Sequence, residues 1–276
     1  MTVGTGLLGA GGINVLVAEK LHDGAVPDSE LLAIAGSSPA SASAADLAKR
    51  YKVVAVRPSD LATAGCQVVV EAAGGSAVRE WLPGLWGQGV ATVVMSIGAL
   101  IDPAVEGAYH DALARGVVIV LPSGGIAGLD GVRSLAAGGG LEKVTITTTK
   151  SPAGLQGAPY LERNKIELPT DRALNVFEGS AREAVQGFPA NVDVAIALSL
   201  AGLGPDNTKV VIRSDPATER TEHFIEVEGA AANLQVRVSS KPSPTNPRTS
   251  YLAGASAVAA LGEAVRSVRF RFAHRP

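Results

Sequence analysis

Cysteine, aromatic residues and long apolar stretches are all scarce in this sequence. The 276 residues include one cysteine, Cys66, so no disulfide bond can form within the chain, and a reducing, cytoplasmic location is expected. No stretch reaches the ~20 apolar residues that span a bilayer, and the glycine-dense start lacks the basic region that opens a signal peptide. A disulfide-stapled or membrane-spanning protein is therefore not expected.

An excess of charge of one sign is also lacking. Lys and Arg total 24 against 26 Asp and Glu, for a net charge of −2, and no long basic run occurs, which argues against a nucleic-acid or membrane-surface partner. No Cys/His cluster or His-x-Glu spacing predicts a metal site, and the Gly-x-Ser-x-Gly motif of serine hydrolases is absent. Cys66 precedes an apolar run and is interpreted as a small buried hydrophobe rather than a nucleophile.

Alternating strand and helix patterns fill the first half of the chain. Short apolar runs predict strands over residues 2–8, 30–35, 52–56, 68–72, 91–95 and 117–121. Helical spacing of apolar residues predicts helices over 13–21, 41–51, 76–88 and 103–115, with a turn or short helix at 60–64. Repeated βα units of this length predict a doubly wound parallel sheet.

The pattern changes after about residue 140. Apolar and polar residues alternate over 142–150, 210–214, 221–228 and 233–239, which predicts antiparallel strands with one solvated face. Helices are expected over 128–136, 181–188, 192–200 and 250–265, and a Pro-rich loop over 241–247. The predicted α/β fold has a nucleotide-binding domain over 1–123 and an α+β domain over 124–249, for substrate binding and dimerisation, with a mostly antiparallel sheet. The helix over about 250–265 is expected to pack back onto the first domain.

A glycine-rich turn after the first strand carries the strongest local signal. Gly9 and Gly11 match the first two glycines of the G-x-G-x-x-G motif, and Asn14 stands in the third position. The first glycine makes the tight turn, and the second lets the backbone approach a pyrophosphate at the start of the helix, where Gly12 and Ile13 lie. The strand–turn–helix context predicts a dinucleotide-binding Rossmann domain, against the alternative of a turn without a ligand.

The end of the second strand lacks the carboxylate that usually binds the adenosine ribose. Ser37 and Ser38 stand there instead, so nothing repels a 2′-phosphate, and their hydroxyls could donate hydrogen bonds to it. The sequence predicts that NADP is accepted as well as NAD. The alternative, in which the two serines only form the turn, stays open.

Several further segments occur together in one order. They are Val69–Ala73, Met95–Leu100, Leu121–Asp130, Val176–Ala181, Phe188–Ala195 and Asn246–Ser250. In this combination, which spans nearly the whole chain, the sequence resembles the L-aspartate dehydrogenase family. The resemblance implies a homodimeric oxidoreductase that interconverts L-aspartate with oxaloacetate and ammonia through iminoaspartate, a compound that links the family to NAD biosynthesis. It also implies hydride transfer between substrate C2 and nicotinamide C4.

The same resemblance implies roles for individual residues. Gly125, in place of the usual alanine, and Asn191 correspond to the nicotinamide-side contacts, and His223, after Asp215-Pro216, corresponds to the catalytic histidine. Ala72 and Ala73, at the end of the fourth predicted strand, are expected at the cofactor. Lys150 ends a Thr-Thr-Thr-Lys run in which the family carries one more basic residue. Lys150, Asn191, Thr249 and Ser250 are the residues expected to bind a dicarboxylate amino or keto acid.

The chemistry of the residues supports His223 independently of the family. Amino-acid oxidation needs a group that moves protons near neutral pH, and histidine suits that task. His22, His110 and His274 lie in polar or terminal positions, whereas His223 begins a strand of the second domain. Two other functions stay open: a reductase of another imine or keto acid, of the dihydrodipicolinate-reductase type, and a non-catalytic nucleotide sensor.

Overall fold

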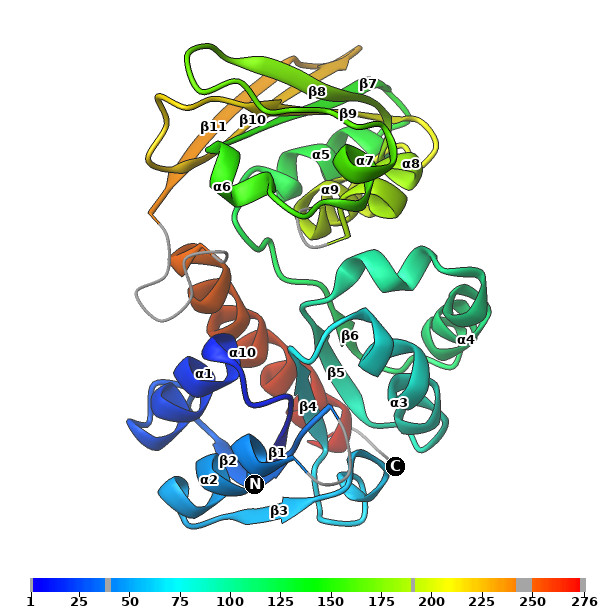
Figure 1. Cartoon of the computed structure of the whole chain (residues 1–276). Coiled ribbons are helices and arrows are strands. Elements are labelled where there is room, and N and C mark those ends of the chain that lie inside the picture. The colour runs from blue at the N-terminus through cyan, green and yellow to red at the C-terminus, as the bar shows by residue number, and fades with distance from the viewer. Residues whose placement is uncertain (1, 38–40, 190–191, 242–249, 274–276) are drawn as a thin grey trace. The chain divides into compact units, whose positions relative to one another are not determined.

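The chain divides into two compact units in the computed structural model (Figure 1), which describes residues 2–37, 41–189, 192–241 and 250–273. Unit 1 comprises Met1–Pro122 together with Ala253–Pro276, and unit 2 comprises Ser123–Leu252. Unit 1 is thus built from two separate stretches of sequence.

Unit 1 contains a six-stranded sheet in which every pairing between neighbouring strands is parallel. The strands are β1 (Val3–Leu8), β2 (Ser29–Ala35), β3 (Val54–Val56), β4 (Val68–Glu71), β5 (Ala91–Val94) and β6 (Ile119–Val120), in the order β3-β2-β1-β4-β5-β6. This order confirms the predicted doubly wound sheet, whose direction of winding reverses between β1 and β4. Strand β6 is shorter than its apolar run predicts.

Helices cover both faces of this sheet. They are α1 (Gly12–His22), α2 (Ala42–Tyr51), α3 (Gly75–Gly87), α4 (Pro103–Ala114) and α10 (Tyr251–Ala273), with two 3₁₀ helices, η1 (Pro58–Asp60) and η2 (Ile97–Ile101). Apolar residues of α1, α2 and α10 pack into one core with β1, β4 and β5. The side chain of Cys66 is 3% exposed, which confirms its reading as a buried hydrophobe.

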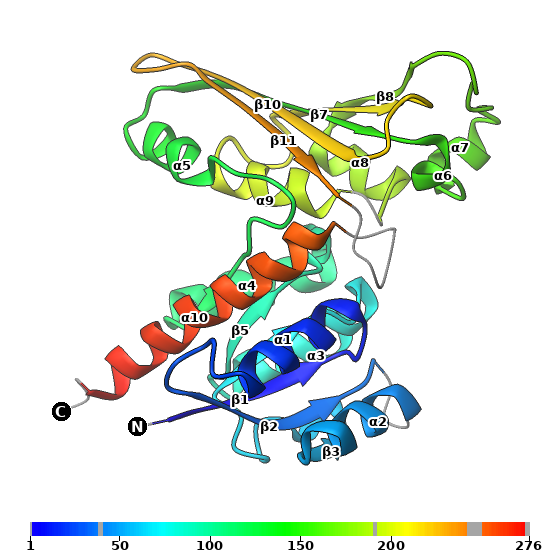
Figure 2. The ribbon, with the colours of Figure 1, turned by 90° about the vertical axis from the view of Figure 1, so that its left-hand side faces the viewer.

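Helix α10 supplies much of that core although it is the last element of the chain. Its contribution comes from Ala257, Ala260, Leu261, Ala264, Val265 and Val268. The helix is longer than the predicted 250–265, because apolar residues continue at helical spacing beyond that range. Leu16 of α1 lies so close that a Cβ on Gly254 would come within 2.9 Å of its side chain, and Figure 2 shows the two helices alongside each other.

Unit 2 contains a five-stranded mixed sheet in the order β11-β10-β7-β9-β8. The strands are β7 (Leu141–Lys150), β8 (Leu174–Ser180), β9 (Thr208–Ser214), β10 (Thr221–Gly229) and β11 (Leu234–Ser240). All neighbours pair antiparallel except β7 and β9, which are parallel. The mostly antiparallel sheet is confirmed, but the prediction that all these strands run antiparallel was wrong for β7 and β9, and β8 was not predicted.

The helices of unit 2 gather on one face of its sheet (Figures 1 and 2). They are α5 (Leu129–Ala137), α6 (Pro152–Leu155), α7 (Pro159–Arg163), α8 (Ala181–Gly187) and α9 (Asp193–Ala201). Val144, Ile146, Ile225 and Val227 are buried, whereas the residues that alternate with them are more exposed. The period-two pattern therefore separates a core face from a second face, as expected.

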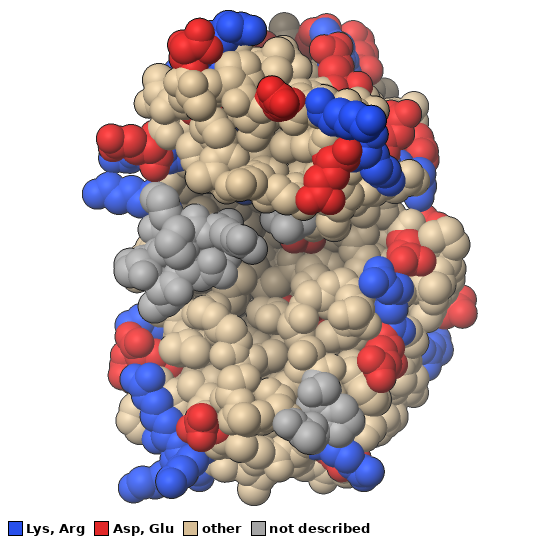
Figure 3. All heavy atoms as spheres, in the orientation of Figure 1, with Lys and Arg blue, Asp and Glu red and all other residues tan. Residues whose placement is uncertain are grey.

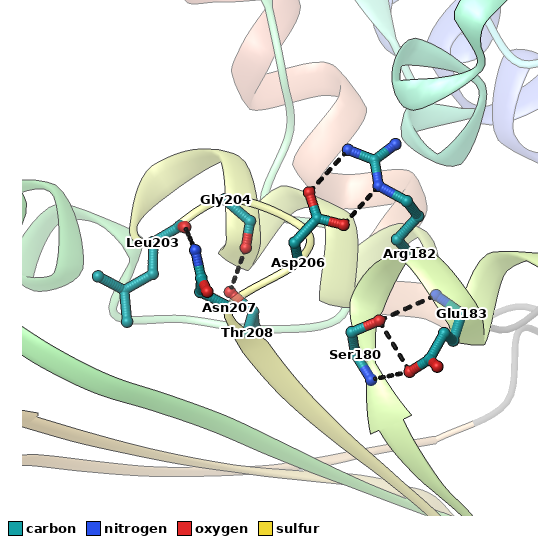
Figure 4. A network of polar contacts seen from close by, with 8 residues as sticks. All are labelled: Ser180, Arg182, Glu183, Leu203, Gly204, Asp206, Asn207 and Thr208. Carbon is teal, nitrogen blue, oxygen red and sulfur yellow. Dashed lines mark hydrogen bonds and ion pairs between the residues drawn. The ribbon is translucent and has the colours of Figure 1, made fainter.

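A polar network fixes the start of α8 against the turn before β9 (Figure 4). Ser180 and Glu183 form a capping box at the N-terminus of α8. Arg182 pairs with Asp206, with Nε 2.6 Å from Oδ1, and the Thr208 hydroxyl donates to the Gly204 carbonyl at 2.9 Å. A capping box satisfies two helix-end donors at once, so α8 begins at a defined residue.

Charges of both signs are interspersed on the face drawn in Figure 3. In the part of the chain that the structure describes, no helix is long and apolar enough to cross a membrane. Over the same residues, no group of three or more His, Cys, Asp or Glu could hold a metal ion.

Candidate functional site

The glycine-rich turn lies at the carboxyl end of β1, where the sheet reverses its direction of winding. Gly11 is the N-cap of α1, and no side chain caps the helix there. The first N–H groups of a helix have no partner within it, so Gly12 and Ile13 open a helix end suited to a negatively charged group. A Cβ on Gly11 would meet nothing within 4 Å, so the backbone is open to a ligand on this side.

Gly9 is required by the backbone itself. Its φ is +100°, in the region that favours glycine, and a Cβ there would lie 2.6 Å from the carbonyl oxygen of Ala72 and 3.0 Å from Cα of Ala73. The amide of Ala72 in turn donates to the Leu8 carbonyl at 2.9 Å. The structure thus brings together the turn after β1 and the Ala72–Ala73 segment after β4, beside a helix start suited to the phosphates of a dinucleotide.

Asn14 replaces the third glycine of the motif and ties the turn to the sheet. Its buried side-chain amide donates to the carbonyls of Leu8 and Gly9, each at 2.9 Å, and to that of Val70 at 3.4 Å. These bonds join the ends of β1 and β4 to the first turn of α1. Asn14 therefore acts in the packing of the turn against the sheet.

Glu71 is a buried carboxylate that the sequence reasoning did not assign to the site. Its oxygens accept hydrogen bonds from the amides of Ala73 (2.7 Å), Gly74 (3.0 Å) and Ser96 (3.0 Å), and from the Ser96 hydroxyl (2.9 Å). Burial raises the pKa of Glu71, and these hydrogen bonds oppose that rise. Glu71 holds the segments after β4 and β5 together. Its position at the end of an apolar strand was the available signal.

Polar residues occupy one end of the otherwise apolar core face of unit 2. Lys150 pairs with Ser214 across β7 and β9, and His223 pairs with Thr148 across β10 and β7. Ser240 ends β11 on the same face. All five side chains are at least nine-tenths buried. Buried polar groups need hydrogen-bond partners, so such a row marks a candidate site in which polar side chains are kept away from water.

His223 is fixed within this row by Thr148. Nδ1 of the imidazole lies 3.0 Å from the Thr148 hydroxyl, and the ring is 4% exposed. Burial, together with the positive charge of Lys150, lowers the pKa of His223 to about 4. The imidazole is therefore neutral at pH 7.

Lys150 is the cation of the row. Burial lowers the pKa of its ammonium group to about 8, while the nearby Asp193 carboxylate acts in the opposite direction. Asp193 is the first residue of α9. A lysine with this pKa is mainly protonated at neutral pH, and only a minor fraction has lost its proton, so its positive charge can attract an anion.

Gly125 lies beside both the other nitrogen of His223 and the hydroxyl of Ser250. A Cβ on Gly125 would lie 3.3 Å from Nε2 of His223 and 3.3 Å from the Ser250 hydroxyl oxygen. The structure therefore brings together three residues that the sequence assigned to the site. Ser37 is an exposed residue after β2. Ser38, Asn191 and Thr249, which were also predicted, lie outside the described residues, as does most of the 241–247 loop.

Thr148, Asp193, Ser214 and Ser240 were not predicted as parts of this site. The signal for Thr148 was its spacing, because in a strand it faces the same way as Lys150, two residues later. Pairing Thr148 with His223 requires the strand register, which the sequence does not state. The exposed positions of His22 and His110 agree with their reading as surface residues.

Comparison with protein families and known proteins places both halves of the chain. Residues 9–122 match the model described as homoserine dehydrogenase, NAD binding domain, and residues 130–264 match that described as aspartate dehydrogenase, C-terminal. The first match confirms the predicted class of cofactor, NAD or NADP.

Individual relatives agree with these matches. The chain is 39% identical to the L-aspartate dehydrogenase of Methanosarcina barkeri over 267 residues, covering 96% of this chain and 97% of the relative. It is 41% identical to that of Bradyrhizobium diazoefficiens over 207 residues, covering 75% and 72% of the two chains. The crystal structure of aspartate dehydrogenase from Thermotoga maritima shares the fold, with a TM-score of 0.70 and 22% identity over 97% of each chain. The chain therefore belongs to the L-aspartate dehydrogenase family.

Proposed function

We propose that this protein is an NAD(P)-dependent dehydrogenase that interconverts L-aspartate with oxaloacetate and ammonia through iminoaspartate. The observation that carries the proposal is the buried row of His223, Thr148 and Lys150, on a chain of this family whose first unit binds a dinucleotide. A nicotinamide cofactor held by unit 1 would supply the hydride acceptor and donor, exchanging hydride between its C4 atom and substrate C2. Water then converts the imine to the keto acid and ammonia. A non-catalytic nucleotide sensor, which is the alternative, would not need such a buried row of polar side chains.

His223 is the proposed acid and base. It transfers protons to and from the substrate nitrogen and the water that attacks C2, directly or through a second water. Because burial keeps the ring neutral at pH 7, one nitrogen is free to accept a proton while the other carries one.

Lys150 is the proposed partner of a substrate carboxylate. A dicarboxylate that leaves water must find cationic or N–H-rich partners, because unpaired buried charge is costly. Asn191, Thr249 and Ser250 are proposed as further substrate contacts, and Asn191 also as a cofactor contact. The position of Ser250 beside Gly125 supports its part in this proposal.

The cofactor is proposed to lie against Gly9, Gly11, Gly12, Ile13, Ala72, Ala73 and Gly125. NADP is expected to be accepted alongside NAD, with Ser37 and Ser38 near the 2′-phosphate. The exposed position of Ser37, with no carboxylate at the end of β2, supports this.

A homodimer formed through the open face of the unit 2 sheet is proposed. Phe224, Thr147 and Val211 form a continuous row there, and ion pairs such as Lys143–Glu228 and Lys209–Glu178 lie on the same sheet. Among the described residues, the helices of this unit lie on the opposite face (Figure 2). A cytoplasmic location, a role in NAD biosynthesis and the absence of a nucleic-acid partner are proposed on the sequence arguments alone.

Steady-state kinetics with both cofactors tests the proposed reaction. Oxaloacetate, ammonia and NADPH or NADH should together consume the cofactor, and L-aspartate should reduce NADP or NAD. Pyruvate and 2-oxoglutarate, with ammonia, serve as comparison substrates. Faster turnover of either than of oxaloacetate would contradict the proposed substrate and favour a reductase of another keto acid.

A His223→Ala variant tests the proposed proton-transfer role. A general acid or base contributes ~10²–10⁴-fold to the rate, so kcat should fall at least ~100-fold. Calorimetric affinity for the cofactor should stay unchanged, since the phosphate turn is untouched. The matched control is His110→Ala, an exposed histidine in unit 1 that should leave kcat unchanged. Unchanged kcat in His223→Ala would remove the imidazole from the mechanism.

A further inference from the structure

The hydroxyl of Thr148 is the hydrogen-bond partner of the imidazole of His223 on the side of Nδ1. The two residues are directly opposite each other in the antiparallel pair of β7 and β10. The bond is 3.0 Å long, and the two side chains are 3% and 4% exposed. Strand register and burial therefore fix this contact.

A neutral imidazole carries one proton, on Nδ1 or on Nε2, and its partners decide which. If Nδ1 carried the proton, the Thr148 oxygen would accept it, and the hydroxyl proton would need another acceptor. Among the residues that the structure describes, the Thr148 hydroxyl has no hydrogen-bond acceptor other than Nδ1 of His223. Leaving a buried donor without an acceptor is costly. If Thr148 donates to Nδ1, this cost is avoided.

We propose that Thr148 is a positioning residue for His223: its hydroxyl donates to Nδ1 and thereby places the imidazole proton on Nε2. Nε2 is the nitrogen beside Gly125, where the missing Cβ leaves room. The free enzyme would then present an N–H donor at this position, suited to a substrate carbonyl oxygen or imine nitrogen. This inference rests on the proposed function of His223 and adds a state of that residue.

The hydroxyl also suits the other half of a proton-transfer cycle. For Nε2 to accept a proton, Nδ1 must carry one, and Thr148 can then turn its hydroxyl and accept from Nδ1. A carboxylate in this position would act only as an acceptor and would hold the proton on Nδ1. Thr148 can serve both states, but its surroundings favour the one with Nε2 protonated.

Nitrogen NMR of the ring tests the tautomer without using turnover. The full-length protein is labelled with ¹⁵N-histidine at pH 7, and the signals of His223 are assigned by their loss in His223→Asn. We expect a protonated-type Nε2 resonance and an unprotonated-type Nδ1 resonance. A protonated-type Nδ1 in the wild-type protein would overturn the inference.

Substitutions at Thr148 separate the hydroxyl from the shape of the side chain. Thr148→Val removes the donor and should move the Nδ1 and Nε2 resonances toward a mixture of the two tautomers. It should also lower kcat/KM by roughly 10- to 100-fold, by analogy with the loss seen when a partner that orients a metal-binding histidine is removed. Thr148→Ser restores the hydroxyl and should restore both the spectrum and most of the activity. A Thr148→Val variant that keeps the wild-type spectrum would overturn the inference.

The matched control is Thr147→Val, the same change on the opposite face of β7, where the side chain is half-buried. It should leave the ring resonances of His223 unchanged. The two proposals fail separately: a correct tautomer without aspartate turnover refutes only the proposed reaction. Aspartate turnover with Nδ1 protonated refutes only the role of Thr148.

Discussion

Two alanine substitutions in the phosphate turn should have opposite consequences, although both remove a motif glycine. At Gly9, φ is +100° and a Cβ would lie 2.6 Å from the Ala72 carbonyl oxygen, which is backbone and cannot rotate away. At Gly11, φ is −81° and a Cβ would meet nothing within 4 Å. The first glycine is thus needed by the fold, whereas the second is proposed to be needed only by the ligand.

The expected magnitudes follow from these contacts. A left-handed backbone costs alanine roughly 1–2 kcal/mol, and forcing an extra carbon into a filled space costs typically ~1–3 kcal/mol. Gly9→Ala should therefore lower the free energy of unfolding by about 2–5 kcal/mol. For Gly11→Ala, a weaker N-cap and a less flexible unfolded chain nearly cancel, so the change should stay within about 1 kcal/mol.

Urea unfolding followed by tryptophan fluorescence measures this difference. Both tryptophans, Trp81 and Trp86, lie in α3, so they report on unit 1, which also holds the turn. Calorimetry with NADH and NADPH should show at least a tenfold loss of affinity in Gly11→Ala, equivalent to about 1.4 kcal/mol. Equal stabilities of the two variants, or full affinity in Gly11→Ala, would refute the reasoning.

Three further outcomes are expected. The pKa of His223 is lowered on folding, so its contribution to stability is present above about pH 6.5 and is lost as the pH falls. Relative to His223→Gln, the free energy of unfolding of the wild-type protein should fall by roughly 3 kcal/mol between pH 7 and pH 4. Urea titrations that show the same pH dependence for both proteins would contradict this. Burial raises the pKa of the Cys66 thiol to about 11, so a thiol reagent should modify this residue in urea but not in the folded protein. Rapid labelling of the folded protein would show that Cys66 is not buried. Glu71→Ala leaves the amides of Ala73, Gly74 and Ser96 without their acceptor. The free energy of unfolding of unit 1, measured by the fluorescence assay, should therefore fall by at least about 2 kcal/mol, and the cofactor should bind more weakly. An unfolding curve like that of the wild-type protein would exclude this role.

Local patterns were sufficient to predict most of the fold. In unit 1, apolar runs and helical spacing placed the strands and helices, because β1, β4 and β5 are buried on both faces. In unit 2, period-two alternation identified the face of β7 that holds Val144 and Ile146, but alternation is the same whichever way a neighbour runs. The parallel pairing of β7 with β9 therefore could not be read from the sequence.

The candidate site was predictable only where a motif or the family resemblance marked it. The motif marked Gly9 and the family resemblance marked His223, and the structure supplies the reason for Gly9 in its backbone angle. Neither signal marked Thr148 or Glu71, since their importance depends on contacts between segments far apart in sequence. Such contacts follow from register and from the ends of neighbouring strands, which single-sequence patterns leave undetermined.

The discontinuous make-up of unit 1 has a consequence for how the protein is made on the ribosome. The core under β1 and β4 includes residues 257–268 of α10, so this unit cannot complete its packing until nearly the whole polypeptide has been synthesised. Unit 2, one uninterrupted stretch, can fold while the nucleotide-binding unit still waits for its last helix. During translation the earlier-made half is therefore the later to mature, and a nascent chain halted before residue 257 would expose the apolar surface that chaperones recognise.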